Sequence, residues 1–177
     1  TSVNKRAISV SAHNGASPAH SPTMSPSEFA QRYLLKPSTD PNVAALLKQL
    51  TGKTDGAVKR SQSDVYVLSK THQVELTFRN ADEVHGRPVT KGAPMLLATL
   101  HIPQSKHLLQ PLVDLPVPVA PGVTRDDVLA NMPRPPDASA EFNGKPRNDR
   151  WLFVGFRLVY IYRDGHELKA VQLIGEV

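Results

Sequence analysis

The fold is decided by the C-terminal stretch Asp149-Arg-Trp-Leu-Phe-Val-Gly-Phe-Arg-Leu-Val-Tyr-Ile-Tyr-Arg-Asp-Gly-His-Glu-Leu-Lys-Ala-Val-Gln-Leu-Ile-Gly175. Aromatic and β-branched residues crowd into two runs, which is typical of pleated, half-buried strands. Asp164-Gly165 lies between the runs and suits a tight reversal, because glycine readily adopts positive φ. Gly155 divides the first run. We therefore expect three closing strands, at Arg150–Val154, Arg157–Tyr162 and Leu168–Ile174.

Upstream of this stretch, the sequence predicts three helices from their capping residues. Ser25 with Glu28 forms a capping-box pattern for the first helix, which should end before Pro37. Asp40-Pro41 begins the second helix, which carries one apolar stripe and stops at Gly52. Thr124 begins the third. The stripe of the second helix consists of Val43, Leu46, Leu47 and Leu50.

The first helices are followed by three further strands. Val74, Leu76 and Phe78 alternate with polar residues, which is the period of a strand with one wet face. We predict these strands at Val65–Leu68, Val74–Arg79 and Met95–Ile102. The polar residues 137–148 are interpreted as a loop.

The order of helix, loop and three strands thus occurs twice. We predict an α+β protein with two helix-plus-antiparallel-sheet units forming a pseudo-repeat. The N-terminal residues lack periodicity and contain several Ser-Pro pairs, which predicts a disordered, flexible tail. The expected divisions are a tail at 1–24, a first unit at 25–102, a proline-rich linker at 103–121 and a second unit at 122–177.

Composition narrows the functional classes. The chain has 177 residues, of which 40% are hydrophobic and 21% charged, as in globular proteins. No apolar run has the length of a membrane helix, and no signal peptide is evident, so we expect a cytoplasmic protein without a membrane partner. The formal charge of +5 favours an acidic partner. The basic residues are scattered, which argues against nucleic-acid binding.

The sequence contains no recognisable catalytic motif. It has no cysteine, and no serine lies in a Gly-x-Ser-x-Gly turn. The histidines are spread singly and the glycines are dispersed, so we expect no metal, no cofactor and no enzymatic activity. The alternative is a small enzyme that uses Glu75, Asp126 or His101 in a cleft between the two units.

The aromatic residues near the C-terminus are the most informative side chains. Along residues 157–163, either Leu158 with both tyrosines or Val159 with Ile161 can face the helices. If Val159 and Ile161 face inward, two tyrosines line the open face, where Tyr and Arg favour protein binding. One candidate binding patch is therefore Arg157, Tyr160, Tyr162 and Arg163. The other is Lys59, Arg60 and Arg79.

Several segments together are similar to a known family. They are Val74-Glu-Leu-Thr-Phe78, Leu115-Pro-Val-Pro-Val-Ala-Pro-Gly-Val-Thr-Arg-Asp-Asp-Val-Leu-Ala-Asn-Met-Pro-Arg-Pro-Pro-Asp137, Asp149-Arg-Trp151, Leu158-Val-Tyr-Ile-Tyr162 and Leu168-Lys-Ala-Val-Gln-Leu173. Over about residues 40–177, the chain resembles immunity proteins of bacterial polymorphic toxin systems, such as those paired with type VI secretion effectors. The doubled helix-and-sheet unit also looks like the beta-lactamase inhibitor protein.

This resemblance implies binding rather than catalysis. The expected partner is a cognate toxin, or effector protein, with an acidic surface, which the chain would neutralise by direct stoichiometric binding in the producer's cytoplasm. A structural or chaperone-like adaptor remains a further alternative. The chemistry of the toxin and the oligomeric state are left open by the sequence.

Overall fold

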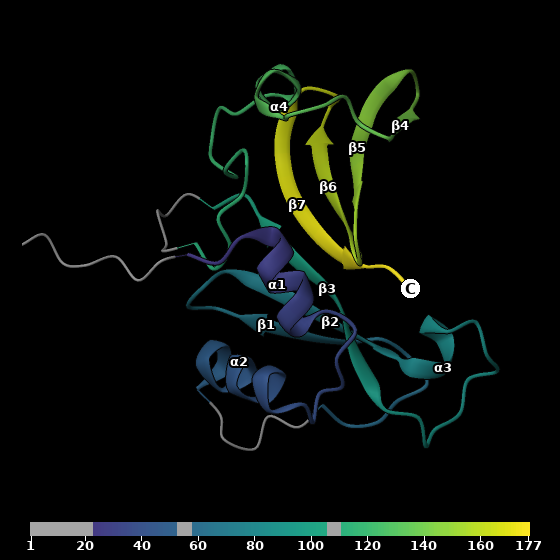
Figure 1. Ribbon diagram of the computed structural model, residues 1–177. Coiled ribbons are helices and arrows are strands. Elements are labelled where there is room, and N and C mark those ends of the chain that lie inside the picture. Colours follow the sequence, from purple (N-terminus) through teal and green to yellow (C-terminus); the bar gives the residue numbers. More distant parts are fainter. Residues whose placement is uncertain (1–22, 53–57, 106–110) are drawn as a thin grey trace, which may run out of the picture.

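The protein is built on one seven-stranded antiparallel sheet, with strand order β1-β2-β3-β7-β6-β5-β4 (Figure 1). The computed structural model describes residues 23–52, 58–105 and 111–177. The strands are β1 (Val65–Ser69), β2 (Val74–Asn80), β3 (Met95–Pro103), β4 (Ala138–Phe142), β5 (Lys145–Phe153), β6 (Phe156–Arg163) and β7 (Glu167–Gly175). The helices are α1 (Pro26–Tyr33), α2 (Pro41–Thr51), α3 (Ala81–Val84) and α4 (Arg125–Asn131). The predicted α+β class is confirmed.

The helices begin and end where their capping residues predicted. The Ser25 side chain accepts a hydrogen bond from Glu28 N, and the Glu28 carboxylate accepts one from Ser25 N. Thr124 and Asp127 form the same reciprocal cap on α4. Helix α2 ends at Gly52, whose φ of 69° is left-handed. Within the described residues, none of the helices has the length and apolar character needed to span a bilayer.

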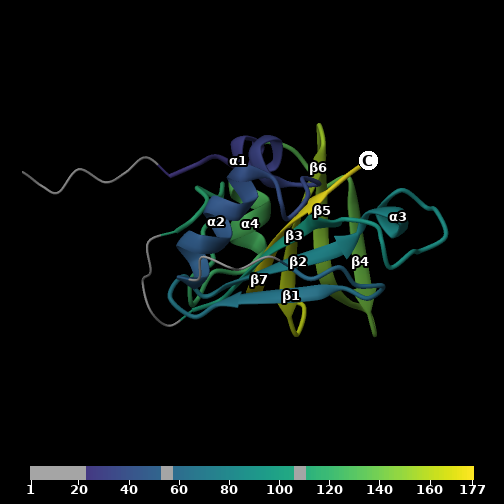
Figure 2. The same cartoon turned by 90° about the horizontal axis from the view of Figure 1, so that it is seen from below.

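Strand β3 joins the two predicted units into one sheet. Its C-terminal part, Thr99–Pro103, pairs with β7. Its N-terminal part instead bonds to the connection between α1 and α2: Leu35 N donates to Leu97 O at 2.8 Å, and Ser38 N donates to Met95 O at 2.9 Å. The connection thus takes the place of β7 where that strand diverges. Figure 2 shows the consequence, with β1–β3 running across the direction of β4–β6.

Three helices cover one face of this sheet, and a single main core lies beneath them. Helices α1, α2 and α4 contribute Phe29, Leu46 and Val128 to the same cluster as Phe78 of β2 and Trp151 of β5. Both sequence units therefore contribute to one core. A second, small cluster of Ala81, Ala93, Leu96 and Val84 lies at α3.

The structure corrects the prediction for residues 137–148. They form a hairpin, in which β4 pairs with the start of β5, rather than a polar loop. Its turn is Asn143-Gly144, with φ values of 51° and 71°. This dipeptide is the sequence signal for such a turn, because both central residues need positive φ. Asp164-Gly165 adopts the same conformation, with φ of 53° and 75°, as predicted.

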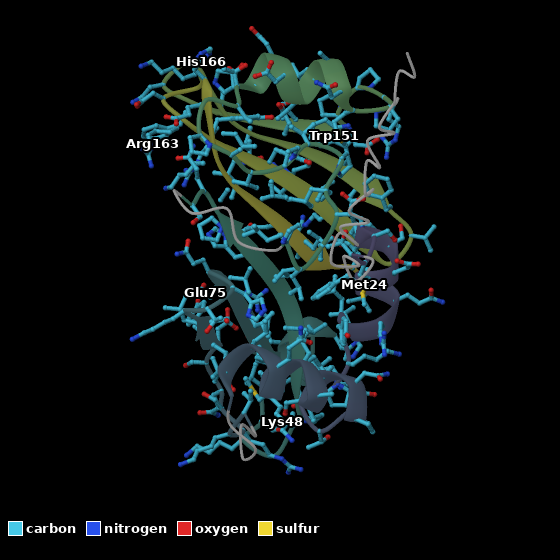
Figure 3. All side chains as sticks on the ribbon, turned by 90° about the vertical axis from the view of Figure 1, so that its left-hand side faces the viewer. Met24, Lys48, Glu75, Trp151, Arg163 and His166 are labelled. Carbon is cyan, nitrogen blue, oxygen red and sulfur yellow. The ribbon has the colours of Figure 1, made fainter. Side chains whose placement is uncertain are left out.

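The ends of the predicted tail and linker can also be placed. Residues 1–22 of the tail lie outside the described residues, but Met24 forms a parallel bridge with Val113 and packs against the core, so it does not belong to a free tail. Met24 lies beside α1 in Figure 3. Within residues 111–121 of the predicted linker, Val113 and Val117 are buried and Leu112 and Leu115 pack against the core, while residues 106–110 lie outside the described residues.

Candidate functional site

Burial shows on which face of the sheet each side chain of β6 lies. Leu158, Tyr160 and Tyr162 are buried in the main core under the helices. Val159 and Ile161 alternate with them and therefore point to the opposite face, together with Arg157 and Arg163. We call this opposite side, which α1, α2 and α4 do not cover, the open face. Of the two arrangements that the sequence allowed, the structure has the one in which Leu158, Tyr160 and Tyr162 face the helices.

Tyr160 and Tyr162 are consequently not surface residues, and their predicted place in a binding patch is wrong. The Tyr160 hydroxyl donates to Val117 O at 3.0 Å and accepts from Val117 N at 3.2 Å. Burial raises the pKa of Tyr160 to about 12. The Tyr162 hydroxyl donates to Asp149 Oδ2 at 2.9 Å. Both hydroxyls have buried partners, which explains why the larger polar side chains occupy the helix-covered face.

Asp149 is the centre of a polar network that Tyr162 completes. Its carboxylate accepts hydrogen bonds from Arg125 Nε at 2.8 Å, Arg125 Nη2 at 3.0 Å and Ser139 Oγ at 2.6 Å. Burial opposes ionisation, but these bonds outweigh it and hold the pKa of Asp149 below its ordinary value. The network ties α4 to β5, β6 and β4. Because every partner is already engaged, we assign it a structural role.

A row of side chains crosses the open face from one sheet edge to the other. The strand registers place one residue from each strand side by side. In the order of the strands, this central row is Leu68, Glu75, His101, Gln172, Val159, Arg150 and Ala138. Every member belongs to the same side of the pleat; Leu68 and Ala138 at the ends are exposed, whereas Val159 within the row is buried.

The middle of the central row is polar. Gln172 Nε2 lies 3.1 Å from His101 Nδ1, and Glu75 is the neighbour of His101 in the adjoining strand. Burial lowers the pKa of His101, while the charge of Glu75 partly opposes that change. Burial therefore favours the neutral form of the His101 imidazole. Two of the three residues named for an enzymatic alternative thus lie together, whereas Asp126 lies on α4, one of the helices on the other side of the sheet.

A second row runs beside the first and carries apolar side chains at its ends. It consists of Tyr66, Thr77, Thr99, Ile174, Arg157 and Leu152. Tyr66 at one end is 63% exposed and Leu152 at the other is 55% exposed, while Leu68, in the central row beside Tyr66, is 59% exposed. Exposed apolar anchors beside polar and cationic groups are characteristic of surfaces that bind other proteins.

The predicted arginines of β6 do not form one compact patch. Arg157 and Arg163 occupy opposite ends of the strand. They are six residue steps apart along the extended strand, which is about 20 Å. Arg157 is paired with Glu176 at 2.8 Å, and Arg163 is exposed beside the Asp164-Gly165 turn. Figure 3 shows Arg163 near His166, at the end of β6 that leads into the Asp164-Gly165 turn.

The second predicted patch is grouped more closely. Arg79 makes two hydrogen bonds to Asp64, at 3.0 and 2.9 Å, near the start of β1. Arg60 Nη1 donates to Gly92 O at 2.8 Å, which places it near the end of β2, and Lys59 beside it is exposed. These three residues therefore lie at one corner of the sheet, next to α3.

The described residues also line an apolar pocket with a volume of about 380 Å³. It lies between the start of β2, the end of β3 and the linker residues 111–121. Ile102, Leu112 and Val119 contribute to its wall, with His72 and Asp114 as titratable groups. Glu75, His101 and Asp126 do not line it. Among the residues that the structure describes, no cluster of three or more histidine or carboxylate side chains is arranged to hold a metal ion.

Sequence reasoning missed the exposed apolar residues of the open face. Tyr66 and Leu68 alternate with Val65 and Val67, and this pattern could have identified an edge strand with two apolar faces. Leu152 was placed in a strand without an assigned face. Arg150 was also missed, because its side of the sheet follows only from the burial of its neighbour Trp151 in the core beneath the helices. Comparison with protein-family models, curated proteins and solved structures found no match.

Proposed function

We propose that this chain is a binding protein that neutralises another protein, as an immunity protein neutralises its cognate toxin. The observation that carries the proposal is the open face: one registered row of side chains crosses all seven strands, a second crosses every strand except β4, and Tyr66, Leu68 and Leu152 are exposed apolar anchors. A rigid sheet presents these side chains without a large ordering cost, which favours affinity.

The charges on this surface support an acidic partner. Arg79, Arg150 and Arg157 lie on the open face, where Arg79 is paired with Asp64 and Arg157 with Glu176, and the chain as a whole carries a formal charge of +5. A positive field accelerates association with an acidic protein and disfavours basic ones. Together with the resemblance described above, this supports a toxin or effector with an acidic surface as the ligand, bound in the cytoplasm of the producing cell.

The direct test is the affinity for the protein encoded beside this chain's gene, measured by titration calorimetry, together with protection of cells that express that protein. Replacing an anchor, Leu152→Ala or Tyr66→Ala, should weaken binding by about 2 kcal/mol or more if it is a central contact. Lys48→Ala on the exposed side of α2 is the matched control and should leave affinity unchanged. Absence of both binding and protection would contradict the proposal.

The second candidate is a small enzyme, favoured by one observation. Glu75 and His101 are neighbours across β2 and β3, and a carboxylate beside a neutral imidazole can act in proton transfer. Turnover of a small molecule that disappears in both Glu75→Gln and His101→Gln would support this function. If Glu75→Gln and His101→Gln both bind the toxin fully and neither loses a catalytic activity, the result would favour the binding function over the enzymatic one. A chaperone-like adaptor would bind several unrelated proteins rather than one.

A further inference from the structure

The two edges of the sheet differ in their protection against further strand pairing. The edge strand β4 has a β-bulge between Ala140 and Glu141, and Glu141 places a charge on it. The edge strand β1 reads Val-Tyr-Val-Leu-Ser and pairs with β2 in regular register, without a bulge. It contains neither proline nor a charged residue. Bulges, prolines and charges are the devices by which proteins block exposed edges, and β1 lacks all three.

The side chains that β1 presents on the open face are also apolar. Within the described residues, β2 is the only strand that pairs with β1. Tyr66 and Leu68 are exposed on its open-face side. An edge strand that no other described strand covers, with exposed apolar side chains, is a template for another strand. The sequence of β1 indicates which strand can pair with this edge.

The sequence of β1 and its flanks is complementary to itself. Asp64 immediately precedes the strand and Lys70 immediately follows it. In an antiparallel pair of two copies centred on Val67, Asp64 of each chain lies opposite Lys70 of the other. Tyr66 lies opposite Leu68 on the open face, again twice. Opposite charges and aromatic–aliphatic pairs are both favourable cross-strand neighbours.

We infer that β1 pairs with β1 of a second copy of this chain, antiparallel and about a two-fold axis at Val67. The contact is isologous, so each cross-strand pair occurs twice. Asp64 retains its bonds to Arg79, because a carboxylate can accept several hydrogen bonds. The dimer joins two sheets into one and places two open faces side by side. This inference concerns self-association rather than toxin binding, but it engages Tyr66 and Leu68, two of the three apolar anchors of the proposed function.

The expected dimer is weak. A pair of five-residue strands buries less surface than the roughly 1,200–2,000 Å² of stable interfaces. Sedimentation equilibrium over the micromolar to millimolar range should therefore show a rise from the chain mass of 19.4 kDa towards twice that value. A chain that remains monomeric over this entire range would overturn the inference.

The two edges supply a matched pair of variants. Leu68→Lys places a charge on β1 and should weaken dimerisation by at least about tenfold, since it removes both Tyr66–Leu68 pairs. Phe142→Lys makes the same change at the exposed end of β4 and should leave dimerisation unchanged. Both residues are exposed, so both variants should keep the melting temperature of the parent chain. Equal effects of the two variants, or no effect of Leu68→Lys, would assign the dimer to another surface.

The register can be tested in the unmodified protein by zero-length carbodiimide cross-linking. Within one chain, Asp64 and Lys70 are separated by about 20 Å of extended strand, so a direct amide between them reports two copies. A mixture of isotope-labelled and unlabelled chains distinguishes such links by mass. A mixed-isotope link between Asp64 and Lys70 is the expected result. A dimer that gives cross-links only elsewhere would overturn the proposed pairing.

Discussion

The helix-covered face and the open face of this sheet are built by the same strands, yet they use their side chains differently. On the covered face, Tyr160 and Tyr162 are buried and their hydroxyls are satisfied by the linker and by Asp149. On the open face, Tyr66 is largely exposed. Residue type therefore does not identify a binding surface in this protein, because burial and hydrogen bonding decide what each aromatic side chain does.

Two arginine–aspartate pairs make the same point with nearly equal geometry. Arg125 and Asp149 on the covered face form two hydrogen bonds of 2.8 and 3.0 Å, and Arg79 and Asp64 on the open face form two of 3.0 and 2.9 Å. Their side chains are 27% and 0% exposed in the first pair, but 42% and 20% exposed in the second. Solvent screens the second pair more strongly, so breaking the first should cost more.

The largest contrast between the faces is expected from apolar truncation. Phe78→Ala on β2 removes a fully buried ring under the helices and should reduce the free energy of unfolding by about 3–5 kcal/mol. Leu68→Ala on the open side of β1 should change it by less than about 0.5 kcal/mol. Denaturant titrations measure both values. Similar losses for the two variants would contradict the assignment of the faces.

Asp149→Asn should come next, with a loss of about 3 kcal/mol, because it leaves Arg125 without its charged partner. The effect should depend on pH. The folded-state pKa of Asp149 lies below its ordinary value of 3.8, so the ion pair contributes fully above that pH and its contribution is lost as the pH falls through the folded-state pKa. The variant should therefore show a shallower decline in stability in acid. Parallel acid-denaturation curves for variant and parent would refute this.

Tyr162→Phe removes only the hydroxyl that donates to Asp149. A hydrogen bond to a charged group typically contributes about 1.5–3 kcal/mol, and this loss should appear in the free energy of unfolding. Tyr66→Phe makes the same chemical change at an exposed ring and is the control, with an expected change within about 0.5 kcal/mol. If both variants were equally stable, the buried network would not depend on Tyr162.

The smallest effect is expected from Asp64→Asn, the counterpart of Asp149→Asn on the open face. A partly exposed ion pair contributes at most about 1 kcal/mol, since water screens its charges. Thermal unfolding at low and high salt should show this small contribution declining as salt is added. A loss as large as that of Asp149→Asn would show that solvent exposure does not distinguish the two pairs.

Local signals in the sequence predicted the elements well where the physics is local. The caps at Ser25, Asp40 and Thr124, and the turn at Asp164-Gly165, depend on neighbours only a few residues away. Residues 137–148 were misinterpreted because their polar composition outweighed the Asn143-Gly144 turn signal. Strand β4 lies at a sheet edge, where neither of its faces needs to be apolar.

The candidate site was predicted less well, because membership of a face is a tertiary property. Arg157 and Arg163 lie on the open face and Tyr160 and Tyr162 on the covered face; in an alternating strand these two pairs could not have shared one face. The alternation along β6 allowed both assignments, since each of its faces carries apolar side chains. The choice depends on Val117 and Asp149, which supply partners for the hydroxyls from far along the chain.

The sequence by itself determined the α+β class, the positions of most helices and strands, and the turns that connect them, because these follow from capping, periodicity and backbone preferences over short distances. Only the tertiary structure decided that β3 joins β7, that one core serves both halves, and which face of each strand is covered. Those features depend on contacts between residues distant in the chain, whose pairing a local pattern does not specify.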